Sequence, residues 1–463
     1  MIEEKEAYGG NEIRDEVMGM DKRENDEKTR EQLYLYSLRK MAEKNLESNR
    51  SFMTGLYNLR AFQYKADEEM RQNPGLRFAM IVMDLANFKS VNAFCGRDEG
   101  DGLLKCIADA FREYEGEHVV LSHFRADIFA MLTPFEHEDD LIAITRQIGD
   151  RIEAYKMNCK IFPAFGICVA TDPEMPASLM KDYASMALKS IKGKFYAKYI
   201  FFNDSMYRRM LTEKQIENEV VDALADGQMK LFVQPKVNME DGSIVGGEAL
   251  VRWLHPEKGI ISPAEFIPVI EKSGFIINVD AYMWEEVFRL IGRRLQENSP
   301  MVPISINISR MHVYDKFFVE RLLDLRERYG VPPYYVPLEL TESGFLEEEE
   351  TMYENMKFLK QQGFRISMDD FGTGYSTMTM LRDEPVDEIK IDKGFLDGME
   401  NAKSRIIVSH VLGMLRDLDL DMIAEGVENE EQQKFLLDCG CRNAQGFYYY
   451  RPMASAEFEK LIG

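Results

Sequence analysis

The chain has 463 residues, of which 45% are apolar, and 57 basic against 80 acidic residues leave a net charge of −23. The length suggests two or three domains of roughly 150 residues each. The negative charge would repel polynucleotide phosphates, and no apolar run approaches the ~20 residues of a membrane helix, so we expect neither a polynucleotide nor a membrane as partner. The charged residues at the start do not resemble a targeting peptide, which predicts a cytoplasmic location.

Cysteines are sparse for this length and lie mostly within apolar stretches. This usage predicts buried, reduced thiols rather than a disulfide framework. A zinc site would need further His or Cys ligands near the one Cys-x-Cys pair, and none is present. The six residues are Cys95, Cys106, Cys159, Cys168, Cys439 and Cys441.

Residues 1–50 form the first predicted segment, a mobile acidic stretch followed by a linker helix. The helical pattern runs from about residue 29 to residue 50 and places apolar side chains on one face. This stripe could pair with a second copy of the chain or pack on its own domain, and both readings remain open. Its members are Leu35, Leu38, Ala42 and Leu46.

Residues 51–205 mix helical patterns with buried strands and predict an α+β domain. The expected strands lie at 78–84, 118–122, 128–132 and 162–169. A charged helical stretch, about 204–226, follows them, and we place the domain boundary at its start.

Residues 206–463 alternate short apolar runs with amphipathic helical segments, the pattern of repeated βα units with a parallel sheet. This length suits one (β/α)₈ barrel, whose catalytic residues come from the C-terminal ends of the strands. Several runs carry or end in polar residues suited to chemistry. These residues are Glu248, Asn307, Glu339, Asp369, Asp370, Lys390, Glu425 and Gln445.

Any one of these polar residues could simply cap the helix that follows its strand. Helix capping does not account for the whole set, because burying Asp369 beside Asp370 without compensation would be costly. Carboxylate and amide oxygens are the ligands that suit Mg²⁺ or Mn²⁺. The sequence therefore predicts a two-metal site of the kind that cleaves phosphodiesters.

The segment from about residue 229 to the end resembles the EAL family of cyclic di-GMP phosphodiesterases. The matching motifs are Gly247-Glu248-Ala-Leu-Val-Arg252-Trp-Leu-His-Pro256, Ser305-Ile-Asn307, Leu338-Glu339-Leu-Thr-Glu342, Asp369-Asp370-Phe-Gly-Thr-Gly-Tyr-Ser376, Ile389-Lys390-Ile-Asp392, Ala424-Glu425-Gly-Val-Glu428 and Gln445-Gly446. The resemblance implies a cyclic-guanylate-specific phosphodiesterase with a TIM-like barrel, which opens cyclic di-GMP to linear pGpG with two Mg²⁺ or Mn²⁺ ions per site.

The same resemblance implies a role for each matching residue. Glu248, Asn307, Glu339 and Asp369 would bind the first metal, Asp370 would help to hold the second, and Glu425 would support the metals and water. Lys390 would orient or activate the attacking water. Gln234, Arg252, Asp392 and Gln445 would lie near substrate or metal, and Glu342 would anchor the loop after Asp370.

Residues 51–200 resemble the GGDEF diguanylate cyclase family, which implies a nucleotidyl-cyclase-like fold. The opening motif at Thr54–Asn58 matches, as do Asp84, Asn92, Asp101 and Lys192, which would form a residual nucleotide or metal site with Asp127. The signature itself is degenerate, because it reads Arg125-Ala126-Asp127-Ile128-Phe129. Glycines that let a backbone approach phosphates are replaced, and so is the Glu.

We therefore expect no cyclase activity and a regulatory or dimerising role for this domain, with GTP as a candidate ligand and a homodimer as the assembly. Two alternatives to the phosphodiesterase follow from the barrel. A receptor that binds cyclic di-GMP without hydrolysis would be expected to lack a metal ligand or the Lys, and none is missing. A kinase, suggested by Asp370-Phe371-Gly372, lacks the accompanying kinase motifs.

Overall fold

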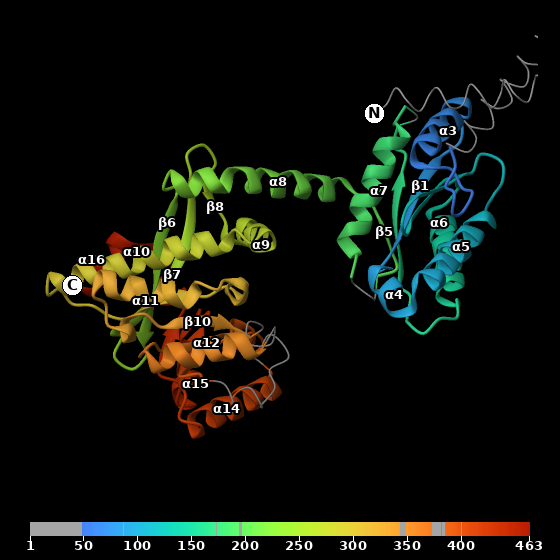
Figure 1. Ribbon diagram of the computed structural model, residues 1–463. Helices are drawn as coiled ribbons and strands as arrows, with labels where there is room; N and C mark the ends of the chain where they lie inside the picture. Colours follow the sequence, from blue (N-terminus) through green and yellow to red (C-terminus); the bar gives the residue numbers. More distant parts are fainter. Residues whose placement is uncertain are drawn as a thin grey trace, which may run out of the picture. The chain divides into compact units, whose positions relative to one another are not determined.

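The computed structural model describes residues 49–86, 88–172, 174–193, 197–342, 349–372, 381, 385–399 and 401–463. The chain divides into two compact units, Met1–Met210 and Leu211–Gly463 (Figure 1). The predicted mobile segment and the apolar stripe of the linker helix lie outside the described residues. The predicted domain boundary falls in helix α8 (Asp204–Ala225), which continues past the division between the two units.

The first unit is an α+β domain built on one five-stranded sheet. Its elements are α3 (Leu59–Gln72), β1 (Phe78–Leu85), α4 (Phe88–Cys95), α5 (Arg97–Arg112), β2 (Val120–Arg125), β3 (Ile128–Pro134), α6 (Glu138–Glu153), β4 (Pro163–Val169), α7 (Ala177–Ile191) and β5 (Tyr199–Phe201). The strand order is β2-β3-β1-β4-β5. All four predicted strands are present, and β2 continues to Arg125.

Strand β1 is buried along its whole length because helices cover both faces of the sheet. Alternate residues beginning at Ala79 join a core with α5 and α6, and those beginning at Phe78 join a second core with α3 and α7. This arrangement accounts for the continuous apolar run in the sequence, since successive side chains of a strand point to opposite faces. Asp84 is the one charged residue in this strand.

The second unit contains a closed barrel. Its elements are β6 (Met229–Asn238), β7 (Ile244–His255), β8 (Gly259–Ile261), α9 (Pro263–Ser273), α10 (Ile276–Gln296), β9 (Ile304–Asn307), η1 (Arg310–Tyr314), α11 (Phe318–Tyr329), η2 (Pro333–Tyr335), β10 (Leu338–Thr341), α12 (Glu349–Gln361), β11 (Ile366–Phe371), β12 (Glu388–Ile391), η4 (Lys393–Phe395), α14 (Ala402–Asp417), β13 (Asp421–Glu425), α15 (Glu430–Asp438), β14 (Asn443–Gln445), β15 (Met453–Ala454) and α16 (Ser455–Ile462).

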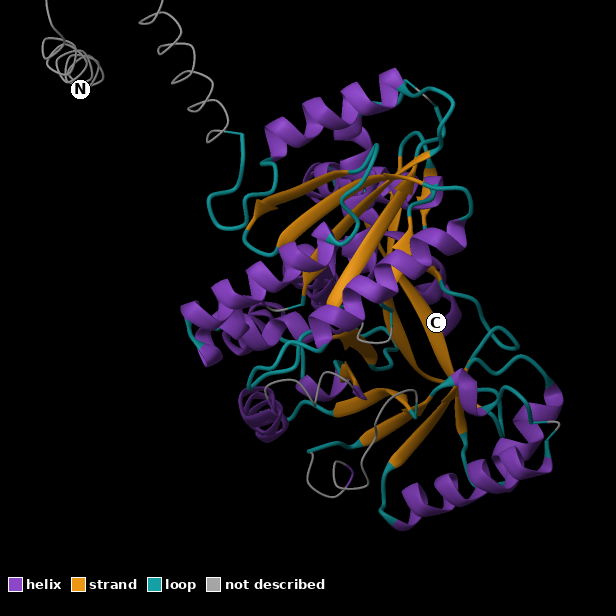
Figure 2. Ribbon diagram, turned by 90° about the vertical axis from the view of Figure 1, so that its right-hand side faces the viewer, coloured by secondary structure: helices purple, strands orange, loops and turns teal. Residues whose placement is uncertain are grey.

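The barrel follows the order β6-β14-β13-β12-β11-β10-β9-β7 and closes where β7 pairs with β6. Helices α10, α11 and α12 lie outside the strands (Figure 1), and Figure 2 shows helices flanking strands throughout the described chain. The predicted barrel is confirmed, but the sheet is not parallel throughout, because β6 runs antiparallel to both β7 and β14. The short segment 239–243 joins β6 to β7, and a connection of that length cannot return the chain for a parallel pair.

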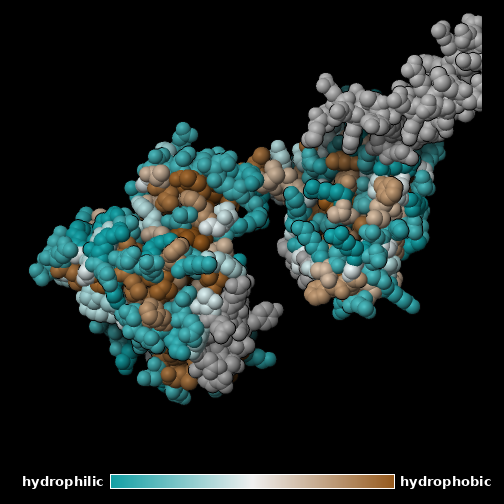
Figure 3. All heavy atoms as spheres, in the orientation of Figure 1, coloured by the Kyte–Doolittle hydropathy of each residue, from teal (hydrophilic) through white to brown (hydrophobic). Residues whose placement is uncertain are grey.

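None of the described helices combines the length and apolar composition needed to cross a membrane. Hydrophilic residues cover most of the visible face of each unit, with smaller hydrophobic patches between them (Figure 3). The cysteine prediction needs one correction. All six are free thiols, yet only Cys168 and Cys441 are buried, and the other four are partly exposed. An apolar neighbourhood in sequence does not ensure burial where an element ends at the surface.

Candidate active site

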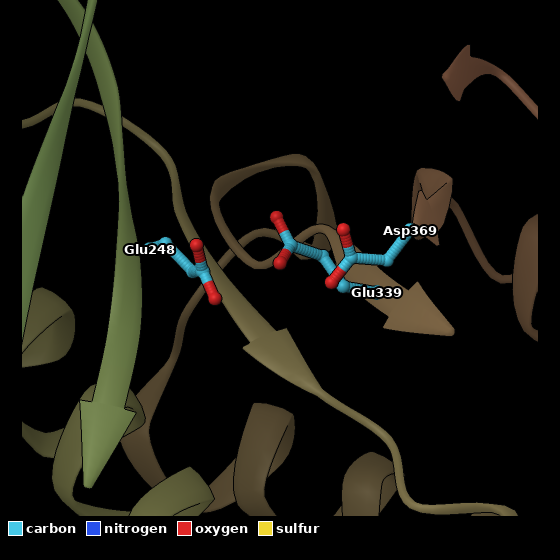
Figure 4. A group of neighbouring side chains, drawn as sticks. All are labelled: Glu248, Glu339 and Asp369. Atoms are coloured by element: carbon cyan, nitrogen blue, oxygen red, sulfur yellow. The ribbon is translucent and has the colours of Figure 1, made fainter. Parts of the chain in front are cut away.

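The polar strand-end residues converge at one end of the barrel. In the parallel part of the sheet, Glu339 of β10 lies opposite Asn307 of β9, and Glu425 of β13 lies opposite Gln445 of β14. The carboxylates of Glu248, Glu339 and Asp369 lie around a common space (Figure 4). Their oxygens come within 4.8 Å of one another. The barrel thus gathers residues that are distant in sequence, as its parallel strands dictate.

Lys390 is at the centre of this cluster and is 1% exposed. Its Nζ donates to Glu339 Oε2 at 2.8 Å and lies 3.4 Å from Glu248 Oε2, 3.0 Å from Asp369 Oδ1 and 2.8 Å from Glu425 Oε1. Although burial opposes the charged form, these carboxylates raise the pKa of Lys390 well above its usual value. The side chain is therefore a buried ammonium ion held by four acidic groups.

A second buried lysine, Lys236 of β6, lies against the same cluster. Its Nζ donates to Glu339 Oε1 at 2.6 Å and to Ser305 Oγ at 3.0 Å, and it lies 3.9 Å from Glu388 Oε1. Glu388 in turn accepts a hydrogen bond from Ser367 at 2.9 Å. Each oxygen of Glu339 thus has its own ammonium partner. Although burial alone would raise the pKa of Glu339, Lys236 and Lys390 lower it to about 2.

The pKa values of the remaining carboxylates shift upward, opposite to the shift of Glu339. Burial raises the pKa of Glu248, Asp369 and Asp370. For Glu425, burial together with the charges of Asp369 and Glu248 outweighs the effect of the lysine and raises the pKa to about 8. The acidic groups exceed the available cations, and bound divalent cations would relieve that excess. This surplus of buried oxygen donors fits Mg²⁺ or Mn²⁺.

Two adjacent aspartates reach the cluster because the strand is irregular there. Neighbouring side chains of a regular strand point to opposite faces. The pairing of β11 with β12 shifts register between Met368 and Phe371, and Asp370 has a φ of 56°. A left-handed conformation at a non-glycine residue is strained, although Asp tolerates it better than most residues. As a result, oxygens of Asp369 and Asp370 lie within 4.8 Å of Glu425.

Amide side chains complete the cluster. Gln445 Nε2 donates to Glu248 Oε2 at 2.6 Å and to Gln234 Oε1 at 3.1 Å, and Asn307 Nδ2 donates to Glu248 Oε1 at 3.1 Å. Gln445 Oε1 is buried without a hydrogen-bond partner among the described residues. A buried oxygen of this kind calls for a ligand or a water. It is a second indication that the site takes up a polar group.

Two hollows border the carboxylates. One, of about 490 Å³, is lined by Arg252, Asn307 and Asp370, and the other, of about 410 Å³, is lined by Gln234, Lys390 and Glu425. Glu248, Leu250 and Asp369 line both. A ligand with two bulky groups joined by a phosphodiester could therefore place one group in each hollow.

Three predicted residues lie at the edge of the cluster rather than in it. Arg252 lines the larger hollow, and its Nη1 donates to the carbonyl oxygen of Val251 at 2.8 Å. Asp392 accepts a hydrogen bond from the Gly394 N–H at 2.8 Å and so caps a short 3₁₀ helix. Glu342, which is buried, accepts one from the Gly372 N–H at 3.1 Å.

The loop that Glu342 was predicted to anchor therefore begins with a direct contact to it. Most of that loop, including Tyr375 and Ser376, lies outside the described residues.

The first unit brings together three of its predicted residues. Lys192 Nζ lies 2.5 Å from Asp84 Oδ2, and Asp127 accepts a hydrogen bond from the Leu85 N–H at 3.3 Å. Burial and the neighbouring Asp84 raise the pKa of Asp127 to about 7. Two carboxylates and one lysine thus remain at the place where the sequence predicts a residual metal or nucleotide site.

The segment 125–129, which we predict to be a degenerate signature, occupies the β2–β3 turn. Arg125 is exposed, Ala126 has a φ of 49°, and Ile128 is partly exposed. Phe129 is fully buried and stacks on His123 with ring centroids 4.3 Å apart. The turn therefore keeps a backbone conformation that favours glycine although it contains no glycine.

Asn92 and Asp101 lie on consecutive helices, α4 and α5. A Cβ added at Gly100 would come within 1.9 Å of Asn92 Oδ1, so only glycine allows this close approach. These two residues, predicted to belong to the residual nucleotide or metal site, are thus carried by helices that pack closely together.

Sequence reasoning missed Lys236, Ser305 and Glu388. Ser305 lies within a recognised motif and Glu388 directly precedes another, but neither had an assigned role. Lys236 follows Gln234 by two positions on the same strand. Residues two positions apart in a strand face the same side, so Lys236 shares the face of Gln234. A lysine at such a position among apolar residues is the signal that could have identified it.

Comparison with known families agrees with this geometry. Residues 217–452 match the EAL domain family, and residues 48–194 match the diguanylate cyclase GGDEF domain family. A relative in Pseudomonas aeruginosa is the bifunctional diguanylate cyclase/cyclic di-GMP phosphodiesterase MucR, 31% identical over 82% of this chain and 56% of MucR. The cyclic di-GMP phosphodiesterase NbdA of the same species is 28% identical over 89% of this chain and 53% of NbdA.

The chain therefore spans about half the length of the curated relatives it matches. Among solved structures, the PaMucR phosphodiesterase in complex with c-di-GMP is 35% identical, with a TM-score of 0.51, and covers 53% of this chain and 99% of that one. Because the EAL match extends over half of the sequence, the family follows from it directly. The chain belongs to the EAL domain family and carries a GGDEF domain ahead of its EAL domain.

Proposed function

We propose that the EAL domain hydrolyses cyclic di-GMP to linear pGpG in a metal-dependent reaction. The observation that carries this proposal is the contact of Lys390 with four carboxylates, in a cluster whose members match the ligands that the resemblance implies. A receptor without activity would be expected to lack one of them. The named activities of MucR and NbdA, and the ligand of the PaMucR structure, give further support.

Each side chain has a distinct role in this proposal. Glu248, Asn307, Glu339 and Asp369 would hold the first metal ion, and Asp370 with Glu425 the second. When bound, the two ions would stabilise charge on the phosphoryl oxygens and favour ionisation of a nearby water. Two ions per site, Mg²⁺ or Mn²⁺, belong to the proposal.

The chain's own groups would orient the reactants. Lys390 can donate a hydrogen bond to the attacking water, and the Glu425 carboxyl beside it can take up or release a proton. Arg252 can reach a substrate phosphate from the larger hollow. Gln234 and Gln445 would fix substrate or water at the smaller hollow, and Asp392 would lie beside the second metal.

We propose that the GGDEF domain lacks cyclase activity and acts in regulation or dimerisation. Arg125 and Ala126 replace the glycines of the signature, and Ile128 replaces its Glu, so the turn offers neither close backbone approach nor the full set of carboxylates. Asp84, Asp127 and Lys192 could still bind GTP or a metal ion.

The phosphodiesterase is tested with the purified full chain, Mg²⁺ or Mn²⁺ and cyclic di-GMP, followed by chromatography of the products. We expect pGpG, no product with a chelator, and no product from Lys390→Ala. Lys357→Ala removes an exposed lysine on α12 and is the matched control, which should keep full activity. Binding of cyclic di-GMP by the wild-type chain without any pGpG would instead establish the receptor.

A separate assay tests the GGDEF domain. The Glu248→Ala chain cannot degrade cyclic di-GMP if the proposal holds, so any that is made from GTP would accumulate. We expect none. Accumulation would show that the degenerate signature still supports synthesis. Light scattering with and without GTP then tests the homodimer.

A further inference from the structure

Two cysteines from different parts of the first unit lie in contact. Cys95 is the last residue of α4, and Cys159 lies in the connection between α6 and β4. The Cys95 thiol donates to Cys159 Sγ at a sulfur–sulfur distance of 3.1 Å across 64 residues of sequence. The contact is therefore a product of the fold, not of local sequence.

A backbone hydrogen bond links the two segments that carry the thiols. The Ala86 N–H, shortly before α4, donates to the Phe162 carbonyl oxygen at 3.1 Å, shortly after Cys159. The neighbouring strands, β1 before α4 and β4 after Cys159, pair along their lengths. A covalent bond between the thiols would therefore need little movement of the main chain, which is the condition for an unstrained disulfide.

Both thiols are also accessible. Each is partly exposed, and Cys159 lines a cavity of about 490 Å³ together with Tyr155, Met157 and Phe162. Burial instead raises the pKa of Cys168 and of Cys441 to about 12. The contact with Cys95 raises the pKa of Cys159 as well, so it is the mutual contact and the exposure of the pair, and not an easily formed thiolate, that distinguish it from the two buried cysteines.

We propose that Cys95 and Cys159 form a reversible disulfide, a modification site in the GGDEF domain. The oxidant is a low-molecular-weight disulfide. One thiolate attacks a sulfur of the oxidant and releases one small thiol, which leaves a mixed disulfide. The second thiolate attacks the protein sulfur of that mixed disulfide and releases the other small thiol. Two electrons pass to the oxidant, and the two protons leave with the small thiols.

The bond would fasten α4 to the segment before β4. Helix α4 carries Asn92, one turn before Cys95, so oxidation would fix the helix that bears a predicted nucleotide contact. Where the cell keeps thiols reduced, disulfides that form are usually transient and regulatory. The pair therefore has the character of a redox sensor, and its chemistry does not depend on the phosphodiesterase.

The test uses the reduced full chain. It is treated with oxidised glutathione, alkylated, digested without reductant and analysed by mass spectrometry. We expect a peptide that links Cys95 to Cys159, its loss on reduction, and alkylated Cys168 and Cys441. In Cys159→Ser, Cys95 should stop at the glutathione adduct, whereas Cys439→Ser should leave the linked peptide unchanged.

Two results would overturn the proposal. One is a wild-type chain in which Cys95 and Cys159 both remain alkylated while Cys439 is modified. The other is a stable glutathione adduct at either residue in place of the linked peptide. If Cys159→Ser does not fold, Cys159→Ala serves instead. Because the linked peptide is identified in the wild-type chain, the principal result needs no variant.

Discussion

The ammonium nitrogen of Lys236 lies 2.6 Å from Oε1 of Glu339, inside the barrel and beneath the acidic cluster. Lys390 holds the other oxygen of the same carboxylate at 2.8 Å. Ser305 fixes Lys236 in turn. Glu339 is thereby held between two cations, and its orientation toward the proposed metals depends on a buried lysine.

Lys236→Met should weaken metal binding. The change keeps the length of the side chain but frees one oxygen of Glu339, so the carboxylate loses its fixed orientation. Outer residues that orient metal ligands typically contribute 10- to 100-fold to metal affinity, and we expect a decrease of about that size. Binding of Mn²⁺ to the substrate-free chain, followed by electron paramagnetic resonance, measures it.

Two variants separate position from charge. Lys230→Met, at an exposed residue near the start of the same strand, removes one positive charge and should leave Mn²⁺ affinity unchanged. Ser305→Ala changes no charge but loosens Lys236, so it should weaken binding in the same direction by a smaller factor. Tighter Mn²⁺ binding in Lys236→Met would mean that the lysine acts only as a repelling charge.

Asp370→Asn should separate the two roles of Asp370, its left-handed backbone conformation and its carboxylate. Asn also tolerates the left-handed conformation found there, so the thermal midpoint should stay close to that of the wild type. Hydrolysis of cyclic di-GMP should fall by more than the roughly 100-fold typical of supporting residues, because the charge of a proposed direct metal ligand is lost. A large loss of stability would show that the carboxylate, not the backbone, holds this turn.

Much of the fold could be predicted from the sequence because the spacing of apolar residues distinguished strands from helices in both domains. The apolar run at β1 and the alternation of short strands with helices led to the α+β domain and to the barrel. The antiparallel β6 was missed, since its apolar pattern does not record strand direction. Only the shortness of the segment 239–243 carried that information.

The candidate site was predicted less evenly. Motifs located the carboxylates and Lys390, because each lies within or at the end of a predicted strand. Lys236 was missed because its role comes from a partner 103 residues away, which only the closed barrel brings near. The Cys95–Cys159 contact was missed for the same reason. Long-range pairs of this kind depend on tertiary packing and leave no local pattern.

Phe129→Ala should destabilise the first unit. Phe129 is fully buried and stacks on His123, so its removal should cost about 3–5 kcal/mol of unfolding free energy. Both tryptophans, Trp253 and Trp284, belong to the barrel, so tryptophan fluorescence follows the second unit while far-ultraviolet circular dichroism follows both.

In urea, we expect a new early transition in circular dichroism and an unchanged fluorescence transition. Ile128→Ala, at the partly exposed neighbour, is the matched control and should cost less than half as much. Equal shifts of both signals in Phe129→Ala would show that the two units unfold together.

The metal-free barrel should lose stability as pH rises. The folded chain holds the pKa of Glu425 at about 8 because of burial and the neighbouring carboxylates, whereas the ordinary value is 4.5. Between these values the folded chain binds a proton that the unfolded chain releases. The contribution of protonated Glu425 to the free energy of unfolding is therefore complete below the ordinary pKa. It is lost as pH rises through the pKa of the folded chain. Burial shifts Glu248 and Asp369 in the same direction.

With a chelator present, the fluorescence transition in urea should come at a lower urea concentration near about pH 9 than near about pH 6. Glu425→Gln cannot ionise, so its dependence on pH should be flatter. Metal ions bind the deprotonated ligands, so saturating Mg²⁺ should restore stability most strongly at the higher pH. A wild-type midpoint that does not change with pH would contradict this prediction. A Glu425→Gln midpoint that changes as steeply as the wild-type midpoint would show that another group causes the pH dependence.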